Sequence, residues 1–493
     1  MKDEFIAWMK SGAAGKVYKD STISRYVRAL EKLCFQIADL DIESTNLFYY
    51  KDILSFKKVD EQIRSNSDFE RVNRASNNGN GDLSAGMSKY MDFLSSRDKT
   101  IISVNVKSGD RRGMVTDKEI INSIKKYIAA KGFTFDDGLI ENYYLSLKSK
   151  PFVILAGTSG TGKTRLVRLF AEAIGATAQN GRYKLVPVRP DWSDSSDLFG
   201  HVDLNGKFIS GAIIDFVKRA ELDENKSPYF LCLDEMNLAR VEYYLSDILS
   251  VIETRELIDG KVTTDPLITE IYYGSDKQAA GKYGTVRIPE NLYIIGTVNM
   301  DETTFPFSKK VLDRANTIEF STVDLTSDAK AGEMVKTVQT DNSFMKAKYV
   351  FFNQCSDHEE LVVRVCAKLQ QLNRILEKAN AHVGYRVRDE IVFYMINNAD
   401  SDLLKEDDAF DNEIMQKILP RIQGSSASVK NMLCDIFKYC AGDYESYQTE
   451  NDDVGSKMLK AAQKEGCKYR KSAEKIAYMV RRYEEDGFTA YWL

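Results

Sequence analysis

The chain has 493 residues, a formal net charge of −5 at pH 7 and 43% hydrophobic residues. This length exceeds that of an ordinary single domain, so roughly two to four domains are expected. The hydrophobic content excludes a disordered chain. Because the net charge is small, any contact with nucleic acid must come from a local basic patch rather than from bulk charge.

Cysteine and histidine usage argues against disulfides and zinc. The seven cysteines are dispersed and form no C-x-x-C pair, which predicts reduced thiols and a cytoplasmic location. The three histidines have no cysteine cluster nearby, so a zinc site is not expected.

The sequence predicts neither a signal peptide nor a membrane span. The first ten residues carry acids and no long apolar core, unlike a signal peptide. Since no apolar run approaches the roughly 18 residues of a membrane span, we expect no membrane partner.

Residues 1–100 are expected to form a mostly helical module for recognition or interaction. Apolar residues recur at helical spacing after Asp20, over 48–63 and over 84–94, and the segment 77–82 is a loop signal. The module could bind DNA through its basic side chains or could simply solvate its helix faces, and the sequence leaves both alternatives open. The basic candidates are Arg25, Arg28, Lys32, Arg71, Arg74 and Lys89. Residues 101–137 are expected to form a linker followed by an amphipathic helix at about 117–130.

A glycine-rich loop follows the apolar run 152–156, which is typical of a buried strand. Apolar residues then recur at helical spacing from Leu166 to Ala173. The order strand, loop and helix predicts a phosphate-binding P-loop, in which backbone N–H groups and the helix N-terminus face phosphate oxygens. Lys163 can reach the β- and γ-phosphates, and the Thr164 hydroxyl can bind Mg²⁺. The loop consists of Gly157, Thr158, Ser159, Gly160, Thr161, Gly162, Lys163 and Thr164.

A second apolar run, 229–233, ends in the two acids Asp234 and Glu235. After a P-loop, this pattern predicts a strand whose first acid holds Mg²⁺ and whose second acid orients the water that attacks the γ-phosphate. A third apolar run, 291–298, ends in Asn299, which could hydrogen-bond the γ-phosphate or the lytic water.

A single arginine, Arg314, stands at the end of a short predicted helix, 311–315. Such an arginine usually reaches the nucleotide of an adjacent subunit and neutralises developing charge there. The alternative is a surface salt bridge. Residues 202–209, with Asn205-Gly206 as the turn, predict a projecting hairpin that either contacts a substrate or is merely exposed. Residues 257–289 are expected to be an inserted loop or hairpin of unknown role.

The order of these motifs resembles AAA+ ring ATPases, and more narrowly the McrB family of motor subunits in modification-dependent restriction systems. The resemblance covers about residues 138–493. It implies an αβα nucleotide-binding subdomain at 138–321, and an all-α lid with the C-terminal subdomain at 322–493. It also implies the roles of metal ligands for Thr164 and Asp234 and of water activator for Glu235. The residues that carry it are 157–164, 234–242, 296–302 and 415–424.

The sequence departs from the McrB pattern at two places. In the Met-Asn-x-x-Asp signature, Val298 replaces Met and Glu302 replaces Asp, while Asn299 is kept. Arg314 lacks the adjacent arginine that the family often has. Arg386 resembles the lid arginine that reports on the γ-phosphate, with Arg388 as second choice, and a structural salt bridge to Asp389 or Glu390 is the alternative. GTP and ATP both remain candidates for the nucleotide, with Mg²⁺.

The predicted function is therefore Mg²⁺-dependent NTP hydrolysis by an oligomeric AAA+ ring, which we expect to be a hexamer. The resemblance implies that the ring drives a separate McrC-like nuclease in restriction or antiviral defence, because the sequence shows no nuclease motif of its own. Residues 1–100 would then recognise DNA, which can be modified. Two alternatives stand beside this prediction: a MoxR-like remodelling chaperone that acts on protein, and an assembly platform that binds nucleotide as a switch.

Overall fold

The computed structural model of the protein divides into two compact units, Met1–Ser103 and Val104–Leu493. Most of the predicted linker, which was expected at about 97–116, lies outside the described residues, as do most of the predicted loop 77–82 and the signature residue Glu302. The predicted boundary at 321/322 lies outside them as well. The described residues are 1–11, 17–32, 37, 40, 42, 44–50, 53–75, 81–98, 116–224, 226–300, 305–320, 337–442 and 453–492.

The N-terminal unit is helical, as expected. Its core is aromatic: the Tyr90 ring meets Phe5, Phe48 and Phe56 edge-on at centroid distances of 5.5, 5.0 and 5.0 Å. The Tyr90 hydroxyl donates to the backbone oxygen of Tyr50, which satisfies its polar end. The helix expected from residue 48 starts only at Ile53, after a short 3₁₀ turn. The helices are α1 (Lys2–Lys10), α2 (Asp20–Lys32), α3 (Ile53–Ser65), α4 (Phe69–Ala75) and α5 (Asp82–Asp98).

The second unit is built on a parallel five-stranded sheet with the order β2-β5-β8-β1-β9. The central strands are apolar throughout because both of their faces are covered. Since all five strands run in the same direction, their carboxyl ends share one edge of the sheet. The strands are β1 (Phe152–Gly157), β2 (Tyr183–Pro187), β5 (Tyr229–Asp234), β8 (Leu292–Asn299) and β9 (Asn316–Phe320).

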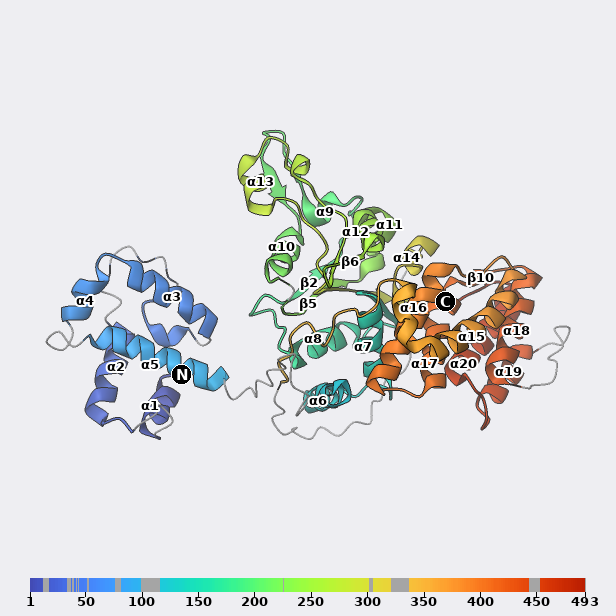
Figure 1. Cartoon of the computed structure of the whole chain (residues 1–493), viewed down its shortest axis with the longest axis horizontal. Coiled ribbons are helices and arrows are strands. Elements are labelled where there is room, and N and C mark those ends of the chain that lie inside the picture. Colours follow the sequence, from blue (N-terminus) through green and yellow to red (C-terminus); the bar gives the residue numbers. More distant parts are fainter. Residues whose placement is uncertain are drawn as a thin grey trace. The chain divides into compact units, whose positions relative to one another are not determined.

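Alternate side chains of β1 enter two different cores. Val153 and Leu155 join one cluster, whereas Phe152, Ile154 and Ala156 join the other. Helices of the first cluster lie on one side of the sheet and helices of the second on the opposite side (Figure 1). The sheet is therefore the middle layer of an αβα sandwich. The first side carries α6 (Asp117–Ala130), α7 (Leu139–Ser149) and α8 (Lys163–Ala173), and the second carries α10 (Ile214–Leu222) and α12 (Ser246–Val251).

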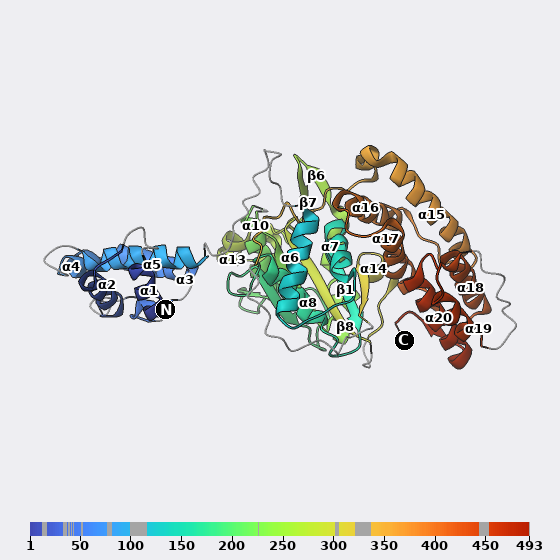
Figure 2. The same cartoon turned by 90° about the horizontal axis from the view of Figure 1, so that it is seen from below.

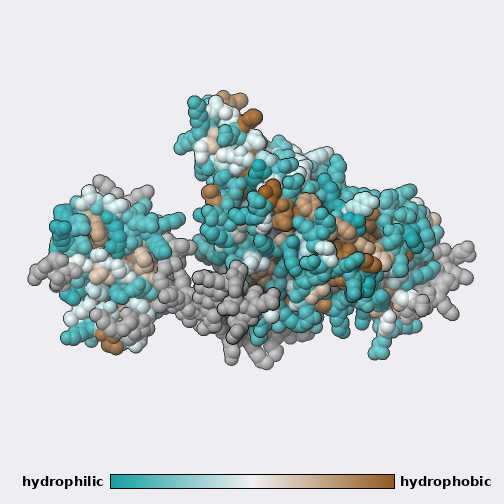
Figure 3. All heavy atoms as spheres, in the orientation of Figure 1, coloured by the Kyte–Doolittle hydropathy of each residue, from teal (hydrophilic) through white to brown (hydrophobic). Residues whose placement is uncertain are grey.

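The predicted hairpin around Asn205-Gly206 is present as β3 (Gly200–Val202) and β4 (Phe208–Ser210). It packs against an insertion that contains the hairpin β6 (Glu256–Ile258) and β7 (Lys261–Thr263), and the helix α13 (Lys277–Tyr283). The Phe208 ring contacts Tyr273 edge-on at 5.0 Å. The part around α13 projects from the sandwich, whereas β6 lies near β2 and β5 (Figure 1), and the far end of the projection shows brown, apolar surface (Figure 3). Its exposed apolar side chains include Leu204 and Ile271.

The C-terminal part of the second unit is helical and packs against the sandwich (Figure 2). Its last residues turn back, because β10 (Gln423–Gly424) pairs with β11 (Thr489–Ala490). Trp492 donates from Nε1 to the backbone oxygen of Pro420 over 3.1 Å. No helix in the described part of the chain is both long and apolar enough to cross a bilayer. The helices are α15 (Glu359–Glu377), α16 (Tyr385–Ser401), α17 (Glu406–Glu413), α18 (Ala427–Ala441), α19 (Val454–Ala462) and α20 (Arg470–Asp486).

Candidate active site

The P-loop lies between β1 and α8. Gly160 and Gly162 have φ values of 79° and 92°, a region that side chains rarely adopt, and Gly162 caps α8. Gly157 is needed for a different reason: a Cβ there would lie 2.1 Å from the backbone oxygen of Phe320 on β9. The glycines therefore allow a sharp turn that leads directly into the N-terminus of α8. That geometry suits phosphate, since N–H groups and the helix dipole point the same way.

Lys163 is almost completely buried and folds back over the loop. Its Nζ donates to the backbone oxygens of Gly157 and Thr158 over 2.9 and 2.6 Å. The Thr161 hydroxyl, which donates to the backbone oxygen of Thr158, lies 3.5 Å from the same Nζ. The ammonium group is thus held inside the curve of the loop, where phosphate oxygens would bind.

Three neighbouring strands bring the predicted catalytic side chains to one edge of the sheet. The Thr164 hydroxyl at the start of α8 donates to Oδ1 of Asp234 over 2.6 Å, although 70 positions separate the two residues. At the end of β8, Nδ2 of Asn299 donates to Oε1 of Glu235 over 3.1 Å. The structure therefore brings together the acids at the end of β5, Asp234 and Glu235, and the asparagine at the end of β8, Asn299.

Thr297, which sequence reasoning missed, connects the two acids. Its hydroxyl donates to Oδ1 of Asp234 over 2.6 Å and accepts the backbone N–H of Glu235 over 3.0 Å. The sequence did carry a signal for Thr297, because successive side chains of a strand point to opposite faces of the sheet. Thr297 stands two positions before Asn299, so both side chains lie on the same face of β8. A threonine in an otherwise apolar buried strand could have been recognised as a polar contact to the neighbouring strand.

The backbone at Glu235 is strained. Its φ of 52° lies in the left-handed region, which is uncommon for residues other than glycine and occurs often at functional sites. The next residue, Met236, packs so closely on β8 that a Cβ at Gly296 would lie 1.8 Å from its sulfur. Gly296 was also missed. The sharp turn after β5 therefore depends on a glycine in the adjacent strand.

The oxygen donors at this edge suit Mg²⁺. Thr164 Oγ1 and Asp234 Oδ1 are hard ligands on adjacent elements, and Mg²⁺ prefers few protein oxygens together with phosphate oxygens and water. When bound, the ion would neutralise charge on the β- and γ-phosphates. Glu235 stands next to this pair, so it can orient a water molecule from the side of β8.

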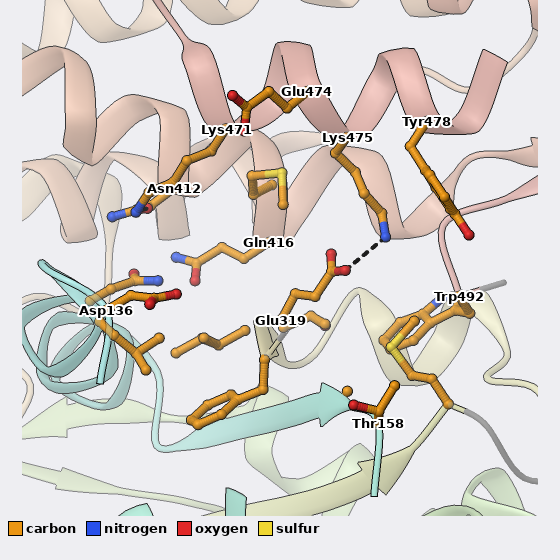
Figure 4. A pocket seen from close by; sticks show the side chains of 18 of the residues that line it. Asp136, Thr158, Glu319, Asn412, Gln416, Lys471, Glu474, Lys475, Tyr478 and Trp492 are labelled. Carbon is orange, nitrogen blue, oxygen red and sulfur yellow. Dashed lines mark hydrogen bonds and ion pairs between the residues drawn. The ribbon is translucent and has the colours of Figure 1, made fainter. Parts of the chain in front are cut away.

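A cavity of about 660 Å³ adjoins the start of the P-loop (Figure 4). Gly157, Thr158 and the end of β9 form its floor, and α20 forms its roof. Glu319 of β9 pairs with Lys475 of α20 over 2.9 Å and joins floor to roof. Its polar lining further includes Asp136, Asp137, Asn412, Gln416, Lys471 and Glu474.

Arg314 lies at the opposite edge of the sheet from the P-loop. It precedes β9, whose residue Asn316 pairs with Val153 near the start of β1. The five residue steps from Phe152 to Gly157 separate the two edges by about 16 Å. Arg314 Nε lies 3.9 Å from Oε1 of Glu253, in a 3₁₀ turn that precedes β6. Arg314 therefore lies away from the P-loop of its own chain, and its contact with Glu253 is an ion pair, the kind of contact expected as the alternative to a role at a neighbour's nucleotide.

Arg386 is in the first turn of α16, and its Nε lies 2.5 Å from Oε2 of the same Glu253. A role on the nucleotide of its own chain does not fit this position, because Glu253 is also bound by Lys150, which precedes β1 at the amino edge. In this structure Arg386 forms a structural salt bridge, as the alternative expected, but its partner is Glu253 rather than Asp389 or Glu390. Arg388, the second choice, pairs with Asp389. A role of Arg386 at a γ-phosphate stays a prediction.

The run 415–424, singled out by the McrB resemblance, lies beside Arg314. A π-helical turn, Ile414–Ile418, brings Nζ of Lys417 to the backbone oxygen of Ala315 over 2.8 Å. Arg421 pairs with Asp313 over 2.9 Å. Both residues that flank Arg314 are thus held by this run, and a π-turn at such a place is typical of functional sites.

In the N-terminal unit, half of the six basic candidates are in ion pairs with acids three or four positions away in the sequence. Arg71 pairs with Asp68, Arg74 with Glu70 and Lys89 with Asp92. Arg25 and Arg28 are exposed on α2. Lys32, at the end of the same helix, is exposed as well, so these three are better placed for a phosphate backbone than the paired residues.

Two family models match separate parts of the chain. Residues 152–315 match the AAA domain (dynein-related subfamily), and residues 334–488 match a domain of unknown function (DUF8727). No curated protein matches the sequence. A solved structure of a presumed ATPase from Cytophaga hutchinsonii is similar at 16% identity with a TM-score of 0.37, over 67% of this chain and 91% of that one. This likeness is too distant to support a functional argument.

The fold, the arrangement of the candidate site and the match to the AAA domain all indicate the same kind of protein. The parallel sheet carries a P-loop, an acidic strand end and a polar strand end in the order that phosphoryl-transfer chemistry uses. The matched segment starts at the first residue of β1 and ends just beyond Arg314. Residues 152–315 therefore form an AAA domain on an AAA+ fold, and the chain is a nucleoside triphosphatase.

Proposed function

We propose that the chain forms a ring, most simply a hexamer, in which arginines of one subunit complete the active site of the next. The observation that carries this proposal is the position of Arg314 and Arg386 at the edge of the sheet opposite the P-loop. Two arginines that cannot reach their own nucleotide, yet share one carboxylate, are placed to meet a triphosphate on another copy. Such arginines stabilise the charge that develops on the transferred phosphoryl group.

In this proposal each residue at the carboxyl edge has one task. Lys163 and the P-loop N–H groups hold the phosphates, and Thr164 and Asp234 hold Mg²⁺. Glu235 orients the attacking water, and the amide of Asn299 fixes the carboxylate of Glu235.

The cavity beside Thr158 is the proposed site of the base and ribose. Its volume is within the range of about 300–1,000 Å³ for small-molecule sites. Its polar lining offers both donors and acceptors, so it suits ATP or GTP. Asn412→Ala is expected to change the ratio of the KM values for the two nucleotides while leaving kcat for the preferred one nearly unchanged. An unaltered ratio would contradict this placement.

We further propose that the ring drives or regulates DNA cleavage by a separate McrC-like nuclease in antiviral defence. The resemblance of four segments to the McrB family supports this role, and so does the contact of the run 415–424 with the flanks of Arg314. The N-terminal unit would bind the DNA through the exposed Arg25 and Arg28. All six cysteines in the described ranges are free thiols, which supports a reducing compartment such as the cytoplasm.

A MoxR-like remodelling ATPase is the second candidate. The match to the dynein-related AAA subfamily fits it equally well, and the projecting region with exposed Leu204 and Ile271 offers an apolar contact for a protein client.

The assembly is tested by steady-state hydrolysis of ATP and GTP over a range of protein concentrations. Specific activity should rise with concentration and disappear in Glu235→Gln. Activity that is independent of concentration would argue against shared active sites. No turnover of either nucleotide, with or without DNA, would favour the nucleotide-switched platform.

DNA binding by the full chain separates the two candidate functions. The double variant Arg25→Ala, Arg28→Ala should weaken binding to duplex DNA and reduce the salt dependence of the affinity, whereas Arg71→Ala, Arg74→Ala should weaken it less because those arginines are already paired. A chain that binds no DNA but whose hydrolysis is stimulated by a protein client would be a remodelling ATPase.

A further inference from the structure

Glu253 is the point where two arginines from distant parts of the sequence meet. Its Oε2 lies 2.5 Å from Arg386 Nε, and its Oε1 lies 3.9 Å from Arg314 Nε. The same Oε1 accepts from Nζ of Lys150 over 2.8 Å. One carboxylate is therefore shared among three cations that come from three different elements.

The shared carboxylate belongs to a longer network. Lys150 also pairs with Glu390 of α16, and Glu390 pairs with Lys417 of the π-turn. Burial alone would raise the pKa of Glu390, but the ammonium groups of Lys150 and Lys417 outweigh it and lower that pKa. Glu390 thus remains charged and connects the helical part of the unit to the start of β1.

The network holds more positive than negative charge. Four cations, namely Lys150, Arg314, Arg386 and Lys417, face the two carboxylates of Glu253 and Glu390. The inner cations are buried, with side-chain exposures of 6% for Lys150 and 1% for Lys417, whereas Arg386 is 41% exposed. The surplus positive charge is therefore presented at the surface mainly by Arg386, because Arg314 is only 21% exposed.

We propose that Glu253 is a positioning residue that holds Arg314 and Arg386 together as a pair for the triphosphate of a neighbouring subunit. The proposal rests on the ring assembly proposed above and adds the residue that orders its arginines. Without a shared acceptor, two guanidinium groups repel each other and their long side chains sample many rotamers. With Glu253 they are pre-ordered, so less ordering is required when the neighbour's phosphates arrive.

The position of Glu253 in the chain fits this role. Its 3₁₀ turn is fixed by Thr254, whose hydroxyl donates to the backbone oxygen of Val251 and accepts the N–H of Asp265. Glu253 can therefore stay in place while the arginines move from its oxygens to phosphate oxygens. The lysines on the inner side compensate its charge in both states.

Steady-state kinetics of full-length Glu253→Gln provide the first test. We expect kcat to fall about tenfold or more, while KM for the nucleotide stays within about threefold, because the P-loop is untouched. Glu256→Gln, an exposed carboxylate three residues on, should retain both values. Wild-type kcat in Glu253→Gln would overturn the proposal.

Mixed assemblies separate the failure of this proposal from the failure of ring assembly. Glu235→Gln subunits cannot hydrolyse but carry an intact arginine pair. Mixed with Glu253→Gln subunits, they should restore activity above the sum of the two homogeneous preparations. A mixture of Arg314→Ala with Glu235→Gln serves as the reference: if only this reference recovers activity, Glu253 has no role in trans, and if the reference fails as well, the shared active site itself is wrong.

Glu253→Asp guards against a trivial loss of folding. It keeps the charge that Lys150 requires but draws the carboxylate back by one methylene. The variant should melt within a few degrees of the wild type, show the same reduced kcat with unchanged KM, and complement Glu235→Gln. A variant that is active at the wild-type rate would show that the arginines do not need this carboxylate in its place.

Discussion

The hydroxyl of Thr297 donates to Oδ1 of Asp234 over 2.6 Å and accepts the backbone N–H of Glu235 over 3.0 Å. A single neutral side chain on β8 thus orients both acids at the end of β5. Because the Thr164 hydroxyl donates to the same Oδ1, this oxygen is fixed from two sides. The position of the carboxylate is set before nucleotide binds.

Thr297→Val removes this hydroxyl while nearly keeping the shape of the side chain. We expect kcat to fall about 10- to 100-fold, because a hydrogen bond to a charged group contributes about 1.5–3 kcal/mol. KM should change little, since no P-loop group is altered. Thr297→Ser, which restores the hydroxyl, should recover most of the rate, and equal rates in the valine and serine variants would refute the assignment.

Asn299→Asp places a second carboxylate about where the amide now lies 3.1 Å from Glu235. The two like charges should repel each other and displace the carboxylate of Glu235, so kcat should fall by about tenfold or more. Asn299→Ala should lower kcat less, because it removes the hydrogen bond to Glu235 without adding a charge. Steady-state kinetics of both variants give the comparison, and equal kcat values in the two variants would argue against contact between residues 299 and 235.

Gly296→Ala tests the packing under Glu235. The added methyl group would lie 1.8 Å from the sulfur of Met236, and we expect the free energy of unfolding to drop by about 1–3 kcal/mol, with loss of activity. Gly281→Ala is the matched control, because it lies in α13 with nothing within 4 Å. That change should be neutral or raise stability by up to about 1 kcal/mol. Thermal melting of the two variants makes the comparison.

Glu413 predicts a pH-dependent stability. Burial raises its pKa from 4.5 to about 8 in the folded protein, although Lys417 and Gln416 oppose the shift. The folded protein therefore binds a proton that the unfolded chain releases between pH 4.5 and 8, so this group's stabilisation is complete below pH 4.5 and is lost as the pH rises through 8. The slope is at most about 1.4 kcal/mol per pH unit.

Glu413→Gln should remove that contribution. The difference in melting temperature between wild type and variant should change steadily from pH 5 to pH 8 and level off above it. A difference that does not depend on pH would mean that Glu413 is ionised throughout in the folded state.

The nucleotide-binding half of the site was predictable because its signals are local. Strand β1, the loop 157–164 and α8 follow one another, so their spacing alone predicts their arrangement. Asp234 and Glu235 were predictable in the same way, because they follow directly on an apolar strand. Helix α6 was expected at about 117–130 and spans Asp117–Ala130. Parallel pairing then brings the strand ends together, as the apolar character of all three strands implies.

The contacts of Arg314 and Arg386 with Glu253 were not predictable, because they depend on which edge of the sheet each segment of the chain reaches. Sequence spacing placed Arg386 in a lid helix but could not say that α16 packs at the amino edge beside Glu253. Glu253 lies in none of the sequence motifs. Gly296 and Thr297 lie in the motif 296–302, but the motif does not show that they contact Met236 and Asp234 on the neighbouring strand.

The fold class, the P-loop and the identity of the acids could be predicted from the sequence, since each rests on contiguous residues whose periodicity and backbone requirements are local. Which side chains share a carboxylate depends instead on how the elements pack. Arg314, Arg386 and Lys150 are separated by up to 236 positions and converge on Glu253 because parallel strands and the helices packed against them fix where each segment ends. Ion pairs of this kind follow from packing geometry, and no local pattern encodes that geometry.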